Sequence, residues 1–369
     1  MIGRLRVSAP GRICLFGEHQ DYLGLPVIAA AINLRIWIEG DFDDSGIYAI
    51  ELPDIGARQE FPASFPLSYE LERDYLRSVV NVLWRSGVPL PKGVRATVRG
   101  NIPINSGTAS SSALCVAWTR FLVAYSAGAK SVDPFQLAKW AHQAEVVEFG
   151  EPGGMMDHVL ASVGGLCLVE FKPELTVERL RGELGCFVLV DSGEAKDTKG
   201  ILARVRGGIE KALNTVREAD PWFELDATPA SRLQRYKALL PAEQWALLAG
   251  AIHNRDITRK ALRVLQGTRI DRRKLGLLLL EHQQVLRDYL QVSTPRIDSL
   301  IQTALEAGAY GAKLNGSGGG GALFAYAPEE PERVRAALGA AGLRAEVVYV
   351  DSGARVESVG DGKAPHPFA

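Results

Sequence analysis

The stretch APGRICLFGEHQDY at residues 9–22 constrains the fold of this chain more than any other segment. Small and apolar residues dominate its first half, as in a buried strand, but Arg12 interrupts them and four polar side chains follow at residues 18–21. Burying a charged group is costly unless a partner satisfies it. The stretch therefore predicts a polar site beside a buried strand, where a ligand offsets that cost.

Length and charge limit the class of the protein. With 369 residues, two fused domains are expected rather than one core. The formal net charge of −1 gives no general attraction to nucleic acid or to an anionic membrane, and the basic cluster at residues 269–274 is interpreted as a solvated helix face. The four cysteines show no pairing pattern, and no signal or membrane segment is visible. We therefore expect reduced thiols and a cytoplasmic protein.

Hydrophobic periodicity predicts an α+β chain, with a strand-rich N-terminal half and a C-terminal half of helices plus a sheet. Strands are expected at residues 3–17, in two runs split by Ala9-Pro10-Gly11, and at residues 26–42, 93–103, 164–171, 184–193, 320–328 and 344–353. Helices are expected at residues 68–87, 111–128, 133–150 and 329–342, with a mainly helical region at residues 200–293. Asp133 is a predicted N-cap, and residues 360–369 are predicted to be a frayed tail.

A loop of small residues joins a predicted strand to a predicted helix in IPINSGTASSSALCVAW, residues 102–118. Backbone N–H groups at a helix N-terminus, with little side-chain obstruction, suit a phosphate group. The serines at residues 110–112 could also bind phosphate or a divalent cation. A plain serine N-cap is the alternative, and three successive serines after Gly107 weaken it. The loop is not the common P-loop, because it has no Gly-Lys-Ser/Thr.

Four consecutive glycines at residues 318–321 carry a high entropic cost in a folded loop. Close approach of the backbone to a ligand or to another chain segment usually offsets such a cost. A loose surface linker is the alternative, but apolar segments flank the loop on both sides. These flanks favour a functional loop.

The segment AEVVEFGEPGGMMDHVLASVGG, residues 144–165, contains two acidic residues of interest. Glu145 lies on the preceding predicted helix, and Asp157 follows the Gly153-Gly154 turn in otherwise apolar surroundings. Such an aspartate is a candidate general base or metal ligand. An N-cap role for Asp157 is an equally good alternative.

Together these motifs resemble the GHMP kinase superfamily, which includes galactokinase, homoserine kinase and mevalonate kinase. Residues 11–22 resemble the galactokinase signature Gly-Arg-x-Asn-Leu-Ile-Gly-Glu-His-x-Asp-Tyr, and residues 149–158, FGEPGGMMDH, resemble its Gly-x-Pro-Cys-Gly-Ile-Met-Asp-Gln motif. Mevalonate kinases share Gly-Glu-His but carry apolar residues where this chain has Asp21 and Tyr22. The chain is thus similar to a sugar kinase of galactokinase type.

Other stretches depart from that type. GLPVIAAAI, DSGEAKDTKGIL and GAKLNGSGGGG are closer to mevalonate kinases. Leu23-Gly24 replace the Asn-Asp usual in galactokinases, and Asn105 and Thr108 replace the Gly and Leu usual in the phosphate loop. The resemblance is therefore to a divergent member.

The resemblance implies a two-domain α+β fold, with the active site between a domain at residues 1–190 and a domain at residues 191–369. It implies transfer of the γ-phosphoryl group of ATP, with Mg²⁺, to the C1 hydroxyl of an aldose of galactose configuration. D-galactose is the family default. L-arabinopyranose has the same ring stereochemistry at the three hydroxyl carbons and lacks only the hydroxymethyl arm, so both sugars stay open.

The resemblance also assigns roles to residues. Asp157 would meet the attacking hydroxyl, and Arg12 would orient Asp157 and neutralise charge on the transferred group. Arginine favours the charged form of Asp157, which leaves open whether Asp157 removes the proton or only orients the hydroxyl. The implied magnesium ligands are Ser111 and Glu145. The implied sugar ligands are Glu18, His19, Asp21, Gly154 and Asp157, and the implied ATP-phosphate loop comprises Asn105, Ser106, Gly107, Thr108, Ala109, Ser110, Ser111 and Ser112.

Two other classes of function stay open. One is a kinase of the same fold that acts on mevalonate or another non-sugar alcohol. The other is a non-catalytic regulator that binds sugar and ATP; the presence of Arg12, Ser111, Glu145 and Asp157 favours an enzyme over it. The composition is compatible with a monomer and with a dimer.

Overall fold

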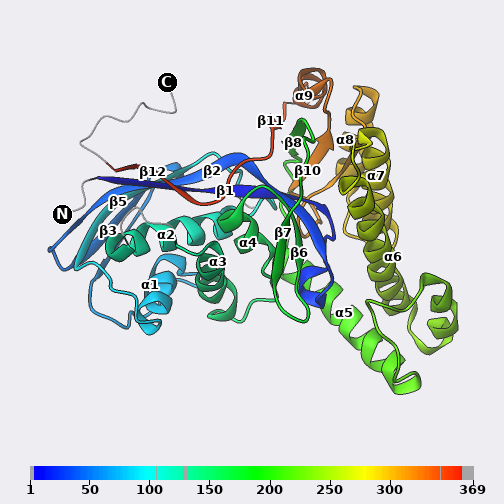
Figure 1. Ribbon diagram of the computed structural model, residues 1–369, viewed down its shortest axis with the longest axis horizontal. Coiled ribbons are helices and arrows are strands. Elements are labelled where there is room, and N and C mark those ends of the chain that lie inside the picture. The colour runs from blue at the N-terminus through cyan, green and yellow to red at the C-terminus, as the bar shows by residue number, and fades with distance from the viewer. Residues whose placement is uncertain (1–3, 105, 128–131, 341, 360–369) are drawn as a thin grey trace.

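The computed structural model describes residues 4–104, 106–127, 132–340 and 342–359, and it arranges them as two β-sheets with helices packed against them (Figure 1). The mixed helix and strand content predicted from the sequence is confirmed. The tail predicted at residues 360–369 lies outside the described residues.

Among the described residues, eight strands form the first sheet. β12, β1, β2, β5, β3 and β4 lie side by side in that order, and β6 and β7 extend the sheet from β2. β3 pairs with β5 in parallel, whereas β1, β2 and β6 pair with their neighbours in antiparallel fashion. The strands are β1 (Leu5–Phe16), β2 (Val27–Asp43), β3 (Ile47–Leu52), β4 (Ala57–Pro62), β5 (Gly93–Gly100), β6 (Leu166–Glu170), β7 (Thr176–Arg179) and β12 (Arg355–Val359).

The first strand corrects the prediction of two runs split by Ala9-Pro10-Gly11. β1 is one continuous strand, and its register against β2 shifts between Pro10 and Arg12 and again between Cys14 and Phe16. A bulge inserts an extra residue and bends a strand without ending it, which explains how these residues stay within the sheet.

Four helices cover one face of this sheet, below it in Figure 1: α1 (Tyr75–Arg85), α2 (Ser110–Ala127), α3 (Pro134–His142) and α4 (Met156–Val163). α1 begins later than predicted, and Leu71 is exposed ahead of it. Asp74 is the N-cap residue but makes no side-chain cap hydrogen bond; its carboxylate instead accepts from the Glu70 N–H and from the Arg77 side chain. The predicted N-cap of α3 is confirmed: Asp133 accepts from the Phe135 N–H at 3.0 Å.

The second sheet contains β11, β8, β10 and β9 in that order, all antiparallel. Its strands are β8 (Phe187–Asp191), β9 (Gly311–Leu314), β10 (Ala322–Tyr326) and β11 (Ala345–Val348), and the helices of this part are α5 (Thr198–Ala219), α6 (Ala242–Leu265), α7 (Arg272–Asp288), α8 (Pro295–Glu306) and α9 (Pro331–Gly339). The chain returns to the first sheet as β12. The domain division at residues 190 and 191 stays a prediction.

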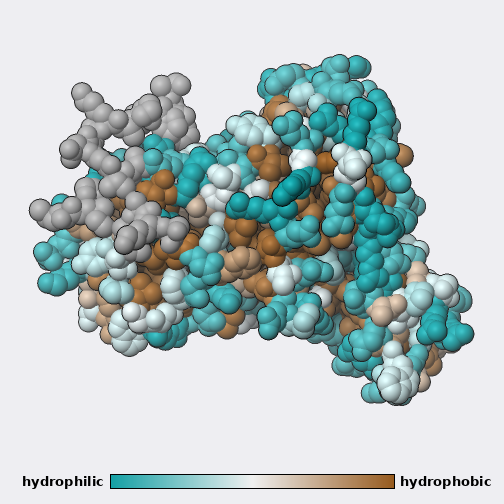
Figure 2. Space-filling model, in the orientation of Figure 1, coloured by the Kyte–Doolittle hydropathy of each residue, from teal (hydrophilic) through white to brown (hydrophobic). Residues whose placement is uncertain are grey.

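The visible surface is mainly hydrophilic, and hydrophobic side chains reach it in scattered groups (Figure 2). Within the described part of the chain, no helix has the length and apolarity needed to cross a bilayer. All four cysteines are free thiols, as predicted; Cys14, Cys115 and Cys167 are buried, whereas Cys186 is half-buried.

Candidate active site

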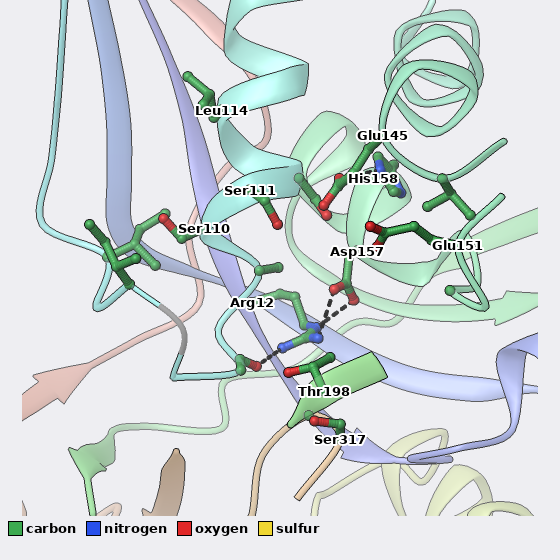
Figure 3. A pocket seen from close by; sticks show the side chains of 18 of the residues that line it. Arg12, Ser110, Ser111, Leu114, Glu145, Glu151, Asp157, His158, Thr198 and Ser317 are labelled. Atoms are coloured by element: carbon green, nitrogen blue, oxygen red, sulfur yellow. Dashed lines mark hydrogen bonds and ion pairs between the residues drawn. The ribbon is translucent and has the colours of Figure 1, made fainter. Parts of the chain in front are cut away.

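A pocket with a cavity volume of about 520 Å³ collects segments that are far apart in the sequence (Figure 3). β1, the start of α2, α4, the segment between β8 and α5, and the loop between β9 and β10 all contribute to it. The predicted site residues that line it are Arg12, Glu18, His19, Asp21, Gly107, Ala109, Ser110, Ser111, Ser112, Glu145, Gly154 and Asp157. The sequence motifs therefore meet in one place.

The ion pair between Arg12 and Asp157 lies at the centre of this pocket (Figure 3). Arg12 is 4% exposed and lies at the first register shift of β1. Its Nε donates to Oδ1 of Asp157 at 2.7 Å and its Nη2 donates to Oδ2 at 2.8 Å, while Nη1 donates to the Gly107 carbonyl. Such a two-pronged contact is the strong form of an arginine–carboxylate pair. It offsets much of the cost of burying Arg12.

Asp157 does not cap its helix. It is the second residue of α4, the N-cap position is Met155, and no side-chain cap hydrogen bond forms there. The N-cap alternative is therefore wrong. The carboxylate is directed at Arg12 and retains some exposure to the pocket, at 27% of the side chain.

The loop before α2 is anchored through its carbonyl groups. The carbonyl of Thr108 accepts from the backbone N–H of Arg12 at 3.1 Å, and that of Gly107 accepts from the Arg12 side chain. The N–H groups of a first helical turn have no partner within their helix. At residues 110–112 they therefore provide donors for an anion at the wall of the pocket.

The side chains of this loop divide into two groups. The hydroxyls of Ser106 and Thr108 are 2.8 Å apart and both reach the carbonyl of Pro103, so they hold the loop together. Ser110 and Ser111 line the pocket. Asn105, predicted as part of the phosphate loop, lies outside the described residues.

Glu145 and Ser111 form the part of the pocket that fits a hard cation. They approach from α2 and from the π-helical turn η3 (Gln143–Val147), and Figure 3 shows them facing the same space as Asp157. Burial alone would raise the pKa of Glu145, but His158 and the hydroxyls of Ser111 and Ser112 outweigh it and hold the pKa below its ordinary value. A buried anionic carboxylate beside a hydroxyl is a donor set suited to Mg²⁺, which takes few protein oxygens and completes its shell with phosphate and water.

Among the described residues, no group of three or more His, Cys, Asp or Glu side chains is placed to hold a metal by itself. The protein alone therefore does not form a full coordination cage. A cation at Glu145 and Ser111 would depend on a bound nucleotide for further ligands.

Asp21 lies in the short helix η1 (Asp21–Leu23) and presses against the turn before α4. A Cβ on Gly154 would lie 1.8 Å from Oδ2 of Asp21, so only glycine permits this approach. Burial, followed by the charge of Asp157, raises the pKa of Asp21 to about 6, although backbone hydrogen bonds from Tyr22 and Met156 oppose the rise. Two carboxylates thus share one end of the pocket.

Glu18 has partners within the protein for both carboxylate oxygens. Oε2 is 2.6 Å from Nζ of the fully buried Lys313, and Oε1 accepts from the Gly316 N–H at 2.8 Å. The pair joins the end of β1 to β9 in the second sheet. The role of Glu18 as a sugar ligand stays a prediction.

Both ring nitrogens of His19 are also engaged. Nδ1 lies 2.7 Å from the Tyr22 hydroxyl and Nε2 lies 3.0 Å from the Ser317 carbonyl. Because a carbonyl only accepts, Nε2 carries the proton and Tyr22 donates to Nδ1. Burial lowers the pKa of His19 to about 4, so the ring is neutral. Contact of His19 with a sugar stays a prediction.

The four glycines at residues 318–321 all have positive φ, and other chain segments crowd each of them. A Cβ would lie 2.4 Å from the Val292 carbonyl at Gly318, 2.2 Å from Ile201 at Gly319, and 2.7 Å from the Ser106 carbonyl at Gly321. Close approach to the chain, rather than looseness, requires glycine here. The surface-linker alternative is wrong.

Lys196 is a pocket residue that the sequence motifs did not identify. It lies between β8 and α5, and its Nζ would be 2.7 Å from a Cβ on Gly107. Burial, followed by the charge of Arg12, lowers its pKa to about 8. Within the part of the chain that the structure describes, it has no hydrogen-bond or ion-pair partner. A lysine in the loop that follows the buried strand, within DSGEAKDTKGIL, was the available signal.

Three family models match the chain. The model for the GHMP kinases N terminal domain matches residues 74–165, the model for GHMP kinases C terminal matches residues 259–343, and the galactokinase galactose-binding signature matches residues 4–41. The mevalonate kinase of Thermococcus sibiricus is 30% identical over 366 residues, covering 96% of this chain and 99% of that protein. A galactokinase of Haemophilus influenzae is 27% identical over 338 residues, covering 88% and 86%.

Solved structures with this fold include both kinds of kinase. Lactococcus lactis galactokinase complexed with galactose matches with a TM-score of 0.81 at 20% identity, covering 95% of this chain and 94% of that one. The mevalonate kinase of Methanococcus jannaschii matches with a TM-score of 0.71 at 18% identity, covering 95% and 99%. These likenesses confirm the predicted fold.

Proposed function

The chain belongs to the GHMP kinase family and is therefore a phosphotransferase, and we propose that it transfers the γ-phosphoryl group of ATP to the anomeric hydroxyl of an aldose of galactose configuration. The proposal joins a phosphate-binding half of the pocket, at the start of α2, to an acceptor half at Asp21 and Asp157.

In this proposal, the carboxylates of Asp21 and Asp157 determine which acceptor binds. Carboxylates accept hydrogen bonds from vicinal hydroxyls, and a site built on such contacts rejects an analogue that lacks the hydroxyl. Arg12, whose charge acts on Asp21, is already paired with Asp157. A substrate carboxylate, such as that of mevalonate, would therefore face like charge at Asp21. A neutral polyol fits this end of the pocket.

The transfer itself requires positioning and charge neutralisation rather than covalent chemistry by the protein. Asp157 would accept a hydrogen bond from the attacking hydroxyl, and Arg12 holds that carboxylate in a fixed orientation. The N–H groups at the start of α2 and the Lys196 ammonium would bind phosphate oxygens. Glu145 and Ser111 would hold Mg²⁺, which supplies positive charge to the phosphates when bound.

D-galactose and L-arabinose both satisfy the ring-hydroxyl requirement at Asp21. They differ in the hydroxymethyl arm, and the walls near Asp21 include the His19–Tyr22 pair, whose polar atoms already bond to one another or to Ser317. The proposal therefore covers both sugars.

A mevalonate kinase is the second candidate, because the relative from Thermococcus sibiricus spans nearly the whole chain at 30% identity. A coupled assay of ADP release with ATP and Mg²⁺ separates the two, using D-galactose, L-arabinose, D-fucose and mevalonate as acceptors. The proposal predicts turnover on an aldose and none on mevalonate. Turnover on mevalonate alone would replace the sugar-kinase proposal.

A further inference from the structure

The side chain that follows Asp157 has a role that none of the motifs assigns. His158 is 2% exposed, and its Nε2 lies 2.7 Å from Oε2 of Glu145. A carboxylate beside an imidazole receives the ring N–H, so Nε2 donates to Glu145. Its other ring nitrogen, Nδ1, is buried and has no hydrogen-bond partner among the described residues. The hydrogen bond to Glu145 is therefore the polar contact that fixes this ring.

We propose that His158 is a positioning residue that fixes the metal-binding carboxylate of Glu145. This inference rests on the proposed function, in which Glu145 and Ser111 hold Mg²⁺. Glu145 has three rotatable side-chain bonds, and the groups that restrain its carboxylate are His158 and the hydroxyls of Ser111 and Ser112, two serines that line the pocket. By holding Oε2, the imidazole leaves Oε1 for the metal. Partners behind a ligand commonly govern metal affinity in this way.

The backbone that carries Glu145 is held independently of His158. Glu145 lies in the π-helical turn η3, and the Ser78 hydroxyl donates to the adjacent Ala144 carbonyl at 2.5 Å. π-helical turns are common at functional sites, where they redirect a side chain. The turn therefore sets where the glutamate lies, and His158 sets how its carboxylate is rotated.

His158 also links the two acidic groups of the site. Asp157 and His158 are consecutive in the first turn of α4, and the first holds Arg12 while the second holds Glu145 (Figure 3). The spacing between the hydroxyl-orienting carboxylate and the metal-binding carboxylate is thus set by one helical turn. The residue usual at this position in the galactokinase motif is glutamine, whose amide can also donate a hydrogen bond.

The test compares His158→Leu, which loses the donor, with His158→Gln, which keeps an N–H donor. Mn²⁺ serves as the probe, and the electron paramagnetic resonance signal of unbound Mn²⁺ measures its affinity for the enzyme–ADP complex without turnover. We expect the Mn²⁺ dissociation constant to rise about 10- to 100-fold in His158→Leu. In His158→Gln it should stay within a few-fold of wild type.

Two controls make the result specific. His142→Leu removes a neighbouring ring, whose centroid lies 5.2 Å from that of His158 and which makes no hydrogen bond to Glu145 among the described residues, and should leave Mn²⁺ affinity unchanged. Glu145→Gln should weaken Mn²⁺ binding at least as much as His158→Leu. The thermal midpoint of each variant shows whether that variant is folded. If His158→Leu is not folded, the Mn²⁺ affinity of His158→Gln is compared with those of wild type and Glu145→Gln instead.

Unchanged Mn²⁺ affinity in folded His158→Leu would overturn the proposal, as would unchanged affinity in Glu145→Gln or equal losses in His158→Leu and His142→Leu. Because this binding assay uses no acceptor, its outcome is independent of whether the acceptor proves to be a sugar.

Discussion

Asp21 has a protonation state set by its surroundings, since burial and the neighbouring Asp157 raise its pKa to about 6. A protonated carboxyl loses acceptor capacity for sugar hydroxyls, so sugar binding requires the ionised form above this pKa. We therefore expect kcat/KM for the sugar to fall as the pH drops through about 6, about tenfold per pH unit below it.

The measurement is the pH profile of kcat/KM for the sugar at saturating ATP. The residual activity of Asp21→Asn should lose this acidic limb, because asparagine does not titrate. An acidic limb of the same position in that variant would assign the titration to another group.

Lys196 supplies a cation that sequence motifs missed, and its lack of a protein partner leaves it available for phosphate. Removing its charge in Lys196→Met should lower kcat/KM for ATP by roughly 10- to 150-fold, which corresponds to about 1.5–3 kcal/mol for a charged hydrogen bond. Lys199→Met is the matched control, because that lysine lines the same pocket but is paired with Glu72 and Glu151. Steady-state kinetics at varied ATP measures both, and equal effects would contradict the assignment.

At the scale of elements, the glycine loop at residues 318–321 packs against the backbone of the phosphate-binding loop at Ser106. Gly321 has a φ of 74°, and a Cβ there would lie 2.7 Å from the carbonyl of Ser106. Gly321→Ala should therefore displace the start of the phosphate loop, lower the thermal midpoint and raise KM for ATP.

Gly87→Ala provides the control for that prediction. Gly87 has a similar φ of 72°, but a Cβ there would meet no atom within 4 Å. Gly87→Ala should therefore lower the free energy of unfolding only by the backbone strain, about 1–3 kcal/mol, and should leave KM for ATP unchanged. Thermal unfolding and kinetics on both variants separate strain from displacement; a wild-type KM in Gly321→Ala would show that the loops are not coupled.

Elements with strong local signals were predictable from the sequence. Asp133 and Pro134 mark the start of α3 through local capping chemistry, and the structure confirms it. The break predicted within β1 was wrong because a bulge, paired to β2 over long range, keeps Pro10 in the sheet. Local turn residues do not reveal such pairing.

At the scale of the whole molecule, the three sequence motifs meet in one pocket because each motif combines chemistry with a loop at the end of an element. Lys196 and His158 could not be assigned in the same way. Lys196 lies in the pocket because the chain that follows β8 passes beside Gly107, and His158 reaches Glu145 because α4 packs near η3. Neither proximity is visible in the local sequence. The partner of Glu18, Lys313, likewise comes from the other sheet.

The central claim is that Asp21 makes a neutral sugar the acceptor of this phosphotransferase. The most direct measurement compares kcat/KM for D-galactose, L-arabinose and mevalonate between the wild type and Asp21→Ala, with the ADPase activity measured without acceptor as the baseline. We expect the wild type to phosphorylate an aldose, and Asp21→Ala to lose this activity to the baseline while keeping its affinity for ATP. Sugar phosphorylation that survives unchanged in Asp21→Ala would contradict it.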